Sequence, residues 1–363
     1  MAETTEHGVR LGAVKLRASL HETIWGGRRL ANLAGKQLPP NTRIGEAWET
    51  ALDAVAETPP FTGKTLGELV DSHGEALLGA RAIAVYGKRF PLLTKFIDAN
   101  SWLSVQVHPD DAYAAAHEGG KLGKTETWYI LHAAPDAQIV YGMRAAASPD
   151  EVRAAIATNR LEDLLHTVAV QAGDVVFVPA GTVHAIGAGV ALYELQEYSD
   201  VTYRLYDYGR AQANGQPREL HVEQGLAVMR YEPPAVTRVT PVAQPTADAG
   251  TTRRTLAACH YFVLDELTIN GGFNSAARPG SVQIISVLEG SCAIAPAQER
   301  GQDGDDDADV VMLGLGETAI LPAAMSACIL YGDSARLARS YVPEQDDHAL
   351  LAWRAAQTVD FGV

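Results

Sequence analysis

The sequence is poor in cysteine. Three cysteines among 363 residues, Cys259, Cys292 and Cys328, lie far apart, and the first 258 residues contain none. This number and spacing exclude a disulfide framework and a cysteine-rich zinc site. They are typical of buried packing thiols in a reducing compartment.

Basic residues are also scarce, with 29 Lys and Arg against 44 Asp and Glu and a formal net charge of −15. This balance argues against nucleic acid as a partner, because phosphate backbones are bound through clustered cations. It still permits a small anionic substrate, since one or two local cations dominate at short range. The acidic N-terminus has no apolar signal region, and no apolar run reaches membrane-spanning length. The sequence predicts a cytoplasmic protein without a membrane partner and leaves monomer and homodimer open.

The chain is longer than one compact domain usually is, and its local patterns predict a mainly β fold with some helices. Short strands separated by glycine turns recur after residue 257 and suggest a β-sandwich or small barrel. Residues 90–98, FPLLTKFID, read as a buried strand whose single charge, Lys95, either reaches the surface or places an ammonium in a pocket. Helices are expected over 65–86 with a break at Gly74, over 110–118, over 148–166 and over 219–229, and a linker over 237–250.

The stretch WLSVQVHPDD at 102–111 places two metal-competent side chains on one strand face. Successive side chains of a strand alternate, so Gln106 and His108 point the same way. A lone histidine in a β-rich segment is more often structural than a ligand. Taken alone, this stretch therefore decides little.

A second motif, GDVVFVPAGTVH at 173–184, has a G-x5-P-x-G-x2-H pattern that resembles the second signature of the cupin β-barrels. The G-x5-P spacing recurs from Gly316 to Pro322, but Ala327 stands where His184 stands in the first copy. The acidic run at 303–309 suggests a calcium loop. Ala308 and Gly314 replace the glycine and glutamate that such a loop needs, so a solvated hairpin tip is favoured.

Together, the motifs resemble those of the type I phosphomannose isomerases in their short bacterial form. The matching segments are IWGGRRL at 24–30, GEAWET at 45–50, FPLLTKFIDA at 90–99, LSVQVHPDD at 103–111, GKTETWYIL at 123–131, GDVVFVPAGTVHAIG at 173–187 and SDVTYRLYDYGR at 199–210. The resemblance implies two cupin (jelly-roll-like) β-barrel domains. We expect a metal-binding catalytic domain with helical insertions at 1–240 and a degenerate cupin-like domain without metal ligands at 241–363.

The resemblance also implies the ligands of one divalent metal ion, most consistent with zinc: Gln106, His108, Glu126 and His184. Two imidazoles, one carboxylate and one amide oxygen form a mixed N/O shell that suits a borderline cation. Such an ion polarises a carbonyl or holds a pair of hydroxyls.

The reaction implied is the interconversion of mannose 6-phosphate and fructose 6-phosphate through a cis-enediolate. By resemblance, Arg204 stabilises the enediolate, Glu194 transfers the proton and Lys124 lies close to the metal. Ser104 and Lys95 match positions associated with the substrate phosphate. Longer family members carry a tyrosine where this chain has Ile186, so a hydroxyl there cannot take part. Glu46 and Glu49 either line the pocket or form structural ion pairs.

Two other functions remain open at this stage. An Fe(II) cupin oxygenase would consume oxygen, and the glutamine ligand disfavours it. A non-catalytic sugar-binding or regulatory cupin would have no evident need for the whole set of charged residues.

Overall fold

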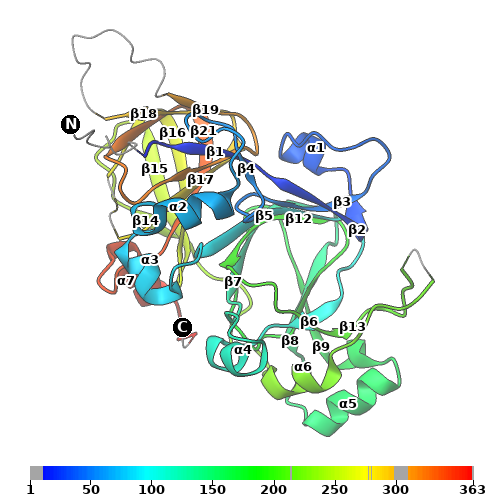
Figure 1. The fold of residues 1–363 in the computed structure, drawn as a ribbon. Coiled ribbons are helices and arrows are strands. Elements are labelled where there is room, and N and C mark those ends of the chain that lie inside the picture. The colour runs from blue at the N-terminus through cyan, green and yellow to red at the C-terminus, as the bar shows by residue number, and fades with distance from the viewer. Residues whose placement is uncertain (1–10, 213–214, 277, 279, 298–309, 362–363) are drawn as a thin grey trace, which may run out of the picture.

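The computed structural model describes residues 11–212, 215–276, 278, 280–297 and 310–361. Three β-sheets dominate this part of the chain and form two β-rich halves (Figure 1). The expected mainly β fold with some helices is confirmed. None of the helices in these ranges combines the length and the apolar character that a membrane crossing requires.

Two antiparallel sheets form the half that carries the sequence motifs. The six-stranded sheet has the order β10-β7-β12-β5-β2-β3, with β2 (Ser19–Gly27), β3 (Ile44–Trp48), β5 (Leu92–Ala99), β7 (Glu126–Ala133), β10 (Val175–Val178) and β12 (Val190–Glu197). The five-stranded sheet has the order β13-β6-β11-β8-β9, with β6 (Val105–Val107), β8 (Gln138–Met143), β9 (Leu165–Ala169), β11 (His184–Ile186) and β13 (Tyr203–Tyr206). Apolar side chains from both sheets share one core cluster, so the sheets pack face to face.

The third sheet has ten strands and contains the first and the last strand of the described chain, β1 and β21. Its order is β14-β15-β16-β21-β17-β20-β1-β4, and β18 pairs with β19 and β21. Its strands are β1 (Val14–Arg17), β4 (Val55–Ala56), β14 (Val242–Gln244), β15 (Thr251–Ala258), β16 (Val263–Ser275), β17 (Gln283–Glu289), β18 (Cys292–Pro296), β19 (Val311–Leu313), β20 (Thr318–Leu321) and β21 (Cys328–Tyr341). The N-terminal strand β1 thus lies among C-terminal strands, with Val14 opposite Ile320 (Figure 1).

The six-stranded sheet is the middle layer of the molecule, which explains why β5 and β12 are buried throughout. On β12, Tyr193 faces the third sheet, where its hydroxyl lies 3.1 Å from the Ser286 Oγ. Its neighbour Glu194 points to the opposite side, because strand side chains alternate. A strand covered on both faces reads as a near-continuous apolar run, so the few polar residues within it need a partner.

The helices follow local signals in the sequence and lie at the edges of the sheets. They are α1 (Leu30–Leu33), α2 (Leu66–Leu78), α3 (Ala80–Tyr86), α4 (Asp111–His117), α5 (Pro149–Ala157), α6 (Val222–Val228), α7 (His348–Ala356) and the 3₁₀ helix η1 (Leu161–Leu164). The expected break at Gly74 is confirmed by its φ of 46° inside α2. The capping box of Ser148 and Glu151 is also present.

Two expectations about local structure are wrong. The helix that begins at Pro149 ends at Ala157 rather than near His166, because Asn159 adopts a φ of 58° and the chain continues as η1 and β9. The expected linker at 237–250 contains β14, which pairs with β15. The possible calcium loop at 303–309 lies outside the described residues.

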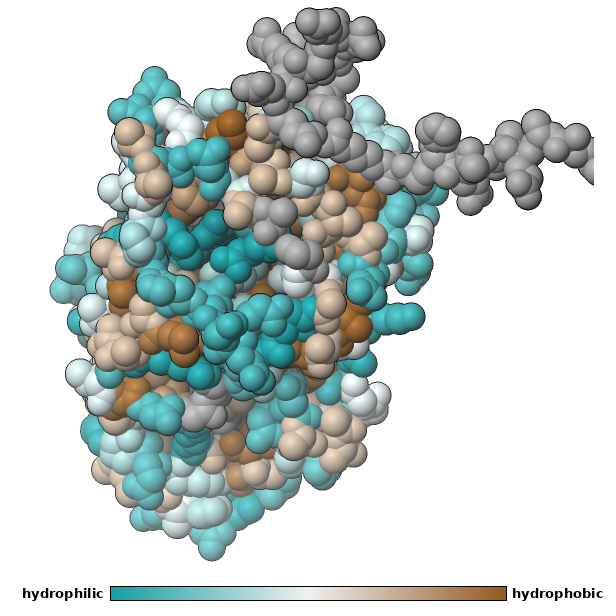
Figure 2. Space-filling model, turned by 90° about the vertical axis from the view of Figure 1, so that its left-hand side faces the viewer, coloured by the Kyte–Doolittle hydropathy of each residue, from teal (hydrophilic) through white to brown (hydrophobic). Residues whose placement is uncertain are grey.

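Figure 2 shows one face of the molecule. Hydrophobic residues on this face are scattered among hydrophilic ones, and a hydrophilic band crosses its middle. Single exposed apolar residues are ordinary on a protein surface. This face therefore gives no evidence for a particular partner.

Candidate active site and metal centre

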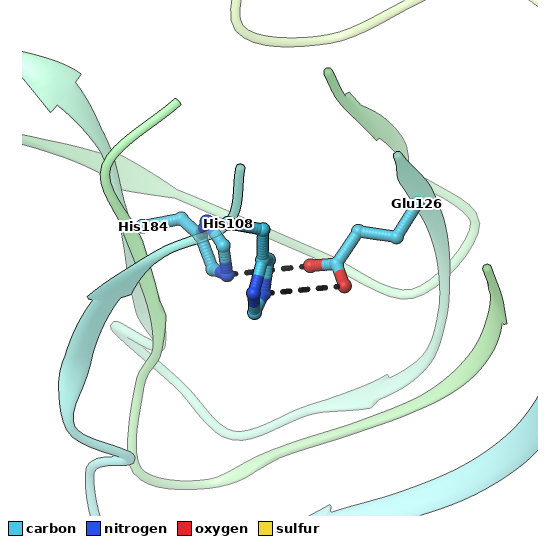
Figure 3. Close-up of side chains that lie close together, drawn as sticks. All are labelled: His108, Glu126 and His184. Carbon is cyan, nitrogen blue, oxygen red and sulfur yellow. Dashed lines mark ion pairs between the residues drawn. The ribbon is translucent and has the colours of Figure 1, made fainter. Parts of the chain in front are cut away.

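Three buried side chains converge where the first two sheets face each other. His108 follows β6, Glu126 begins β7 and His184 begins β11. One potential ligand atom from each lies within 4.8 Å of the others. Figure 3 shows both imidazoles directed at the carboxylate, with Nε2 of His184 3.3 Å from Oε1 and Nε2 of His108 3.7 Å from Oε2. Within the described ranges, this is the one such group of three or more His, Cys, Asp and Glu side chains.

Strand pairing brings Gln106 to the same cluster. Gln106 is the register partner of His184 on β11, and its Nε2 lies 3.3 Å from the Nε2 of His184. The oxygen and nitrogen of an amide are nearly equal in size, so a half-turn of this group presents an oxygen instead. Gln106 and His108 are two positions apart, and both reach the cluster: Gln106 lies beside His184, and His108 lies beside Glu126.

The protonation of the two histidines suits metal binding. Nδ1 of His108 lies 2.8 Å from the Val201 carbonyl, and Nδ1 of His184 lies 2.9 Å from the Thr182 carbonyl. A carbonyl only accepts, so Nδ1 carries the proton and Nε2 keeps a lone pair. Burial lowers the pKa of both imidazoles, and the Lys124 ammonium lowers that of His108 further. Both rings are therefore neutral near pH 7.

Glu126 is fully buried, and no backbone or neutral donor in the described structure hydrogen-bonds to its carboxylate oxygens. The Lys124 ammonium lies 2.6 Å from Oε2 and 3.3 Å from the Nε2 of His108. A buried carboxylate whose lone pairs remain available is costly unless a cation uses them. The donor set of two imidazole nitrogens, one carboxylate and one amide therefore fits a divalent cation.

The cluster adjoins a cavity of about 350 Å³ between the two sheets. Its walls are made by Glu46, Trp48, Lys95, Ile97, Leu103, Gln106, Lys124, Trp128, Ile186, Glu194, Ser199, Asp200, Thr202 and Arg204. Such a volume accommodates a small ligand. A larger hollow of about 730 Å³ beside α7 shares none of these residues.

One wall of the cavity is a row of side chains in register across four strands. Trp48 pairs with Lys95, Lys95 with Glu194, and Glu194 with Trp128. The Lys95 ammonium lies 3.1 Å from Oε1 of Glu194, and the Trp128 indole N–H donates to Oε2 at 3.0 Å. The second carboxylate near Lys95 is that of Glu46, at 3.5 Å.

The contacts within this wall determine the ionisation states of Glu194 and Lys95. Although burial opposes ionisation of Glu194, Lys95 and Lys124 hold the pKa of its carboxyl below the usual value. Although burial also opposes the charged form of Lys95, Glu194 and Glu46 raise the pKa of its ammonium. Glu194 is thus a carboxylate and Lys95 an ammonium near neutral pH. Lys95 does not reach the surface, since 7% of it is exposed.

The opposite wall carries Arg204 and Ser104. Arg204 on β13 is the register partner of Gln106, and its Nε donates to the Ser104 Oγ at 3.3 Å. Its Nη1 donates to the Glu219 carbonyl at 2.9 Å. Burial and the nearby Arg218 lower the pKa of Arg204, yet a guanidinium stays charged at any ordinary pH.

All nine residues expected in the site on sequence grounds therefore lie at the cluster or close to the cavity. Sequence reasoning missed Trp48 and Trp128. Trp128 follows Glu126 by two residues, so period-two alternation could have placed it on the same face. Ile186 also lines the cavity. Of the two other glutamates, Glu46 lines the cavity, and Glu49 is a buried ion-pair partner of Lys36 at 2.6 Å.

Glu197, at the end of β12, is hydrogen-bonded to the residue that precedes β7, the strand that begins with Glu126. Its Oε1 accepts from the backbone N–H of Thr125 at 2.8 Å, whereas its Oε2 is buried without a hydrogen-bond partner. Burial, followed by the nearby Asp111 carboxylate, raises the pKa of Glu197 well above its usual range. The folded state therefore holds this proton at pH values where the unfolded chain has released it.

The variant Glu197→Gln should gain stability relative to the wild type as the pH rises. A raised folded-state pKa means that the wild type loses stability from about pH 4.5 upward, and glutamine does not titrate. Between pH 5 and 8.5 we expect the difference in unfolding free energy to shift by about 1–3 kcal/mol in favour of the variant. Denaturant titrations at both pH values measure it, and a pH-independent difference contradicts the argument.

The fold and this site define a mainly β protein with a candidate metal centre in a polar cavity. A family model described as "Phosphomannose isomerase type I, catalytic domain" matches residues 13–137. Mannose-6-phosphate isomerase of Streptococcus mutans is 38% identical over 322 residues, covering 88% of this chain and 95% of the relative. Mannose-6-phosphate isomerase ManA of Bacillus subtilis is 40% identical over 300 residues, covering 82% and 91%.

A solved structure is similar as well. The crystal structure of the mannose 6-phosphate isomerase from Bacillus subtilis superimposes with a TM-score of 0.79 at 34% identity, covering 91% of this chain and 99% of the other. The two relatives named above match over more than nine tenths of their own length. The chain belongs to the type I phosphomannose isomerase family.

Proposed function

We propose that this protein is a metal-dependent aldose–ketose isomerase that interconverts mannose 6-phosphate and fructose 6-phosphate. Its membership of the family supports this reaction. The observation that carries the proposal is the buried His108, Glu126 and His184 cluster beside a cavity lined by charged groups. A sugar phosphate needs a polar pocket with cations, and the isomerisation needs a base near C1 and C2.

We infer that Gln106, His108, Glu126 and His184 together hold one divalent ion. Zinc suits this set because two neutral imidazoles, a carboxylate and an amide make a mixed N/O shell. When bound, such an ion supplies electrostatic stabilisation of negative charge on substrate oxygens. Lys124, 2.6 Å from Glu126, adds a second positive charge on the same side of the cavity.

We assign the transfer of the proton between C2 and C1 of the substrate to Glu194. The reaction breaks the C2–H bond of the aldose, forms a cis-enediolate and delivers a proton to C1. Glu194 is ionised, with the Trp128 indole at one oxygen and the Lys95 ammonium 3.1 Å from the other. A fixed carboxylate of this kind is able to take the proton from one carbon and return it to the next.

The opposite wall completes the site. We assign to the Arg204 guanidinium the stabilisation of the enediolate oxygen as its charge develops. Ser104, hydrogen-bonded to Arg204, and Lys95 are assigned to the phosphate. Lys95 already has two carboxylate neighbours, so its contribution to the phosphate is expected to be the smaller one.

We further propose two domains, the catalytic one at 1–240 and a degenerate cupin-like one at 241–363 without metal ligands. The second G-x5-P copy supports this division, since Gly173 and Gly316 both open turns with positive φ. Ala327 then stands in place of a histidine. The pairing of β1 and β4 with the C-terminal sheet means that the N-terminal segment contributes to both halves.

A coupled assay for fructose 6-phosphate formed from mannose 6-phosphate tests the function. Metal-replete protein should turn over, EDTA treatment should reduce the rate by at least about 10²-fold, and zinc should restore it, because the ion's contribution is several kcal/mol. Binding of mannose 6-phosphate without turnover would point to a non-catalytic sugar-binding cupin. Oxygen consumption with iron would point to an oxygenase.

Removal of the guanidinium in Arg204→Ala should lower kcat by about 10²–10³-fold, the loss expected when one stabilising donor is removed. The metal content should stay at the wild-type level, because Arg204 contacts Ser104 and a carbonyl and none of the proposed ligands by hydrogen bond. Arg153→Ala, at an exposed ion pair with Glu223, is the matched control. An unchanged rate removes Arg204 from the mechanism.

A further inference from the structure

Two guanidinium groups, those of Arg210 and Arg218, bind the Asp207 carboxylate, and a third, that of Arg204, lies near them. Arg218 donates from Nε to Oδ2 at 2.7 Å and from Nη2 to Oδ1 at 2.6 Å. Arg210 donates from Nη2 to Oδ1. The Asp207 side chain is 6% exposed, so both ion pairs are largely shielded from solvent. The third guanidinium, that of Arg204, lines the cavity.

Arg204 is bound in a different way from the other two arginines. Its hydrogen bonds go to two neutral acceptors, the Ser104 hydroxyl and the Glu219 carbonyl. No carboxylate in the described part of the chain forms an ion pair with it. Arg210 and Arg218 lie close enough to act electrostatically on Arg204, and Asp207 and Glu219 offset part of this positive charge. The concentration of guanidinium groups at this end of the cavity favours an anion such as a phosphate monoester.

The Asp207 carboxylate also ties the chain after β13 to the segment that carries Ser104. Arg210 and Arg218 both donate to it, and Nη1 of Arg210 also donates to the Trp102 carbonyl. Asp207 therefore connects the two guanidiniums to each other and to the cavity wall. Bidentate arginine contacts fix orientation as well as charge.

We propose that Asp207 is a positioning residue that holds Arg210 and Arg218 beside Arg204, so that their positive charge adds to that of the Arg204 guanidinium at the end of the cavity where Ser104 is assigned to the phosphate. This inference rests on the proposed function and deepens it. Without the carboxylate, three like charges repel one another, and Arg210 and Arg218 lose their shared partner. Asp207 touches no reacting atom, and its effect passes through the arginines.

Kinetics of Asp207→Asn, together with calorimetric binding of orthophosphate, test this role. The KM for mannose 6-phosphate and the Kd for orthophosphate should each rise by about 10–100-fold, the range seen when groups that orient ligands are removed. The fall in kcat should be smaller than the rise in KM, because the metal ligands and Glu194 are untouched. Asp207→Glu should recover part of both losses.

Asp265→Asn is the matched control. Asp265 is also buried and also accepts from two arginines, Arg253 at 3.0 Å and Arg339 at 2.7 Å, but it lies on β16 in the third sheet. This variant should lose stability and keep the wild-type KM and phosphate affinity. A wild-type KM and phosphate Kd in Asp207→Asn, or an equal rise in KM in Asp265→Asn, overturns the proposal. Absence of turnover in the wild type instead refutes the proposed function, and orthophosphate binding still tests Asp207.

Discussion

Replacing the His184 imidazole with a methyl group should remove the bound metal ion and lower kcat by at least about 10³-fold, because Lewis-acid stabilisation is worth several kcal/mol. His184 is 1% exposed, and the Thr182 carbonyl aims its Nε2 at Glu126. The methyl group of His184→Ala has no atom that can bind a metal ion. Metal content after dialysis, measured by mass spectrometry, and the coupled assay check the result.

The control for this variant is His132→Ala. His132 lies on β7, the strand that begins with Glu126, but its side chain is exposed. It should retain both the metal and the rate. A full complement of zinc in His184→Ala would refute the ligand assignment, whereas loss of zinc in both variants would indicate a general effect on the fold.

The second large effect is expected for Glu194→Gln. General acid–base groups contribute about 10²–10⁴-fold, so kcat should fall within that range while metal content stays unchanged. Glutamine keeps the size of the side chain and an acceptor for the Trp128 indole, but it has no carboxylate to take the proton. Lys95 retains a carboxylate neighbour in Glu46, 3.5 Å away.

Glu223→Gln removes a carboxylate from an exposed ion pair with Arg153 and is the matched control for Glu194→Gln. Its rate should equal that of the wild type. Deuterium exchange between solvent and C2 of mannose 6-phosphate adds an independent measure of proton abstraction. Wild-type turnover or exchange in Glu194→Gln rules out this residue as the base.

The strands and helices with strong local signals could be predicted from the sequence. The apolar run around Lys95 forms β5, and the Ser148–Glu151 capping box begins α5. The predicted end of α5 was wrong, because Asn159 adopts a positive φ that the spacing of apolar residues in this segment does not reveal. The strand β14 was missed because its pairing with β15 comes from outside its own short segment.

The sequence alone determined which chemical groups the site contains and which of them share a strand face, because alternation is a local property of an extended chain. Gln106 and His108 are the clearest example. The tertiary structure decided what each charge does. Lys95 could have reached the surface, but pairing of β5 with β12 places it beside Glu194, and pairing of β6 with β13 places Gln106 beside Arg204. These contacts join residues about a hundred positions apart, and only strand order and burial determine them.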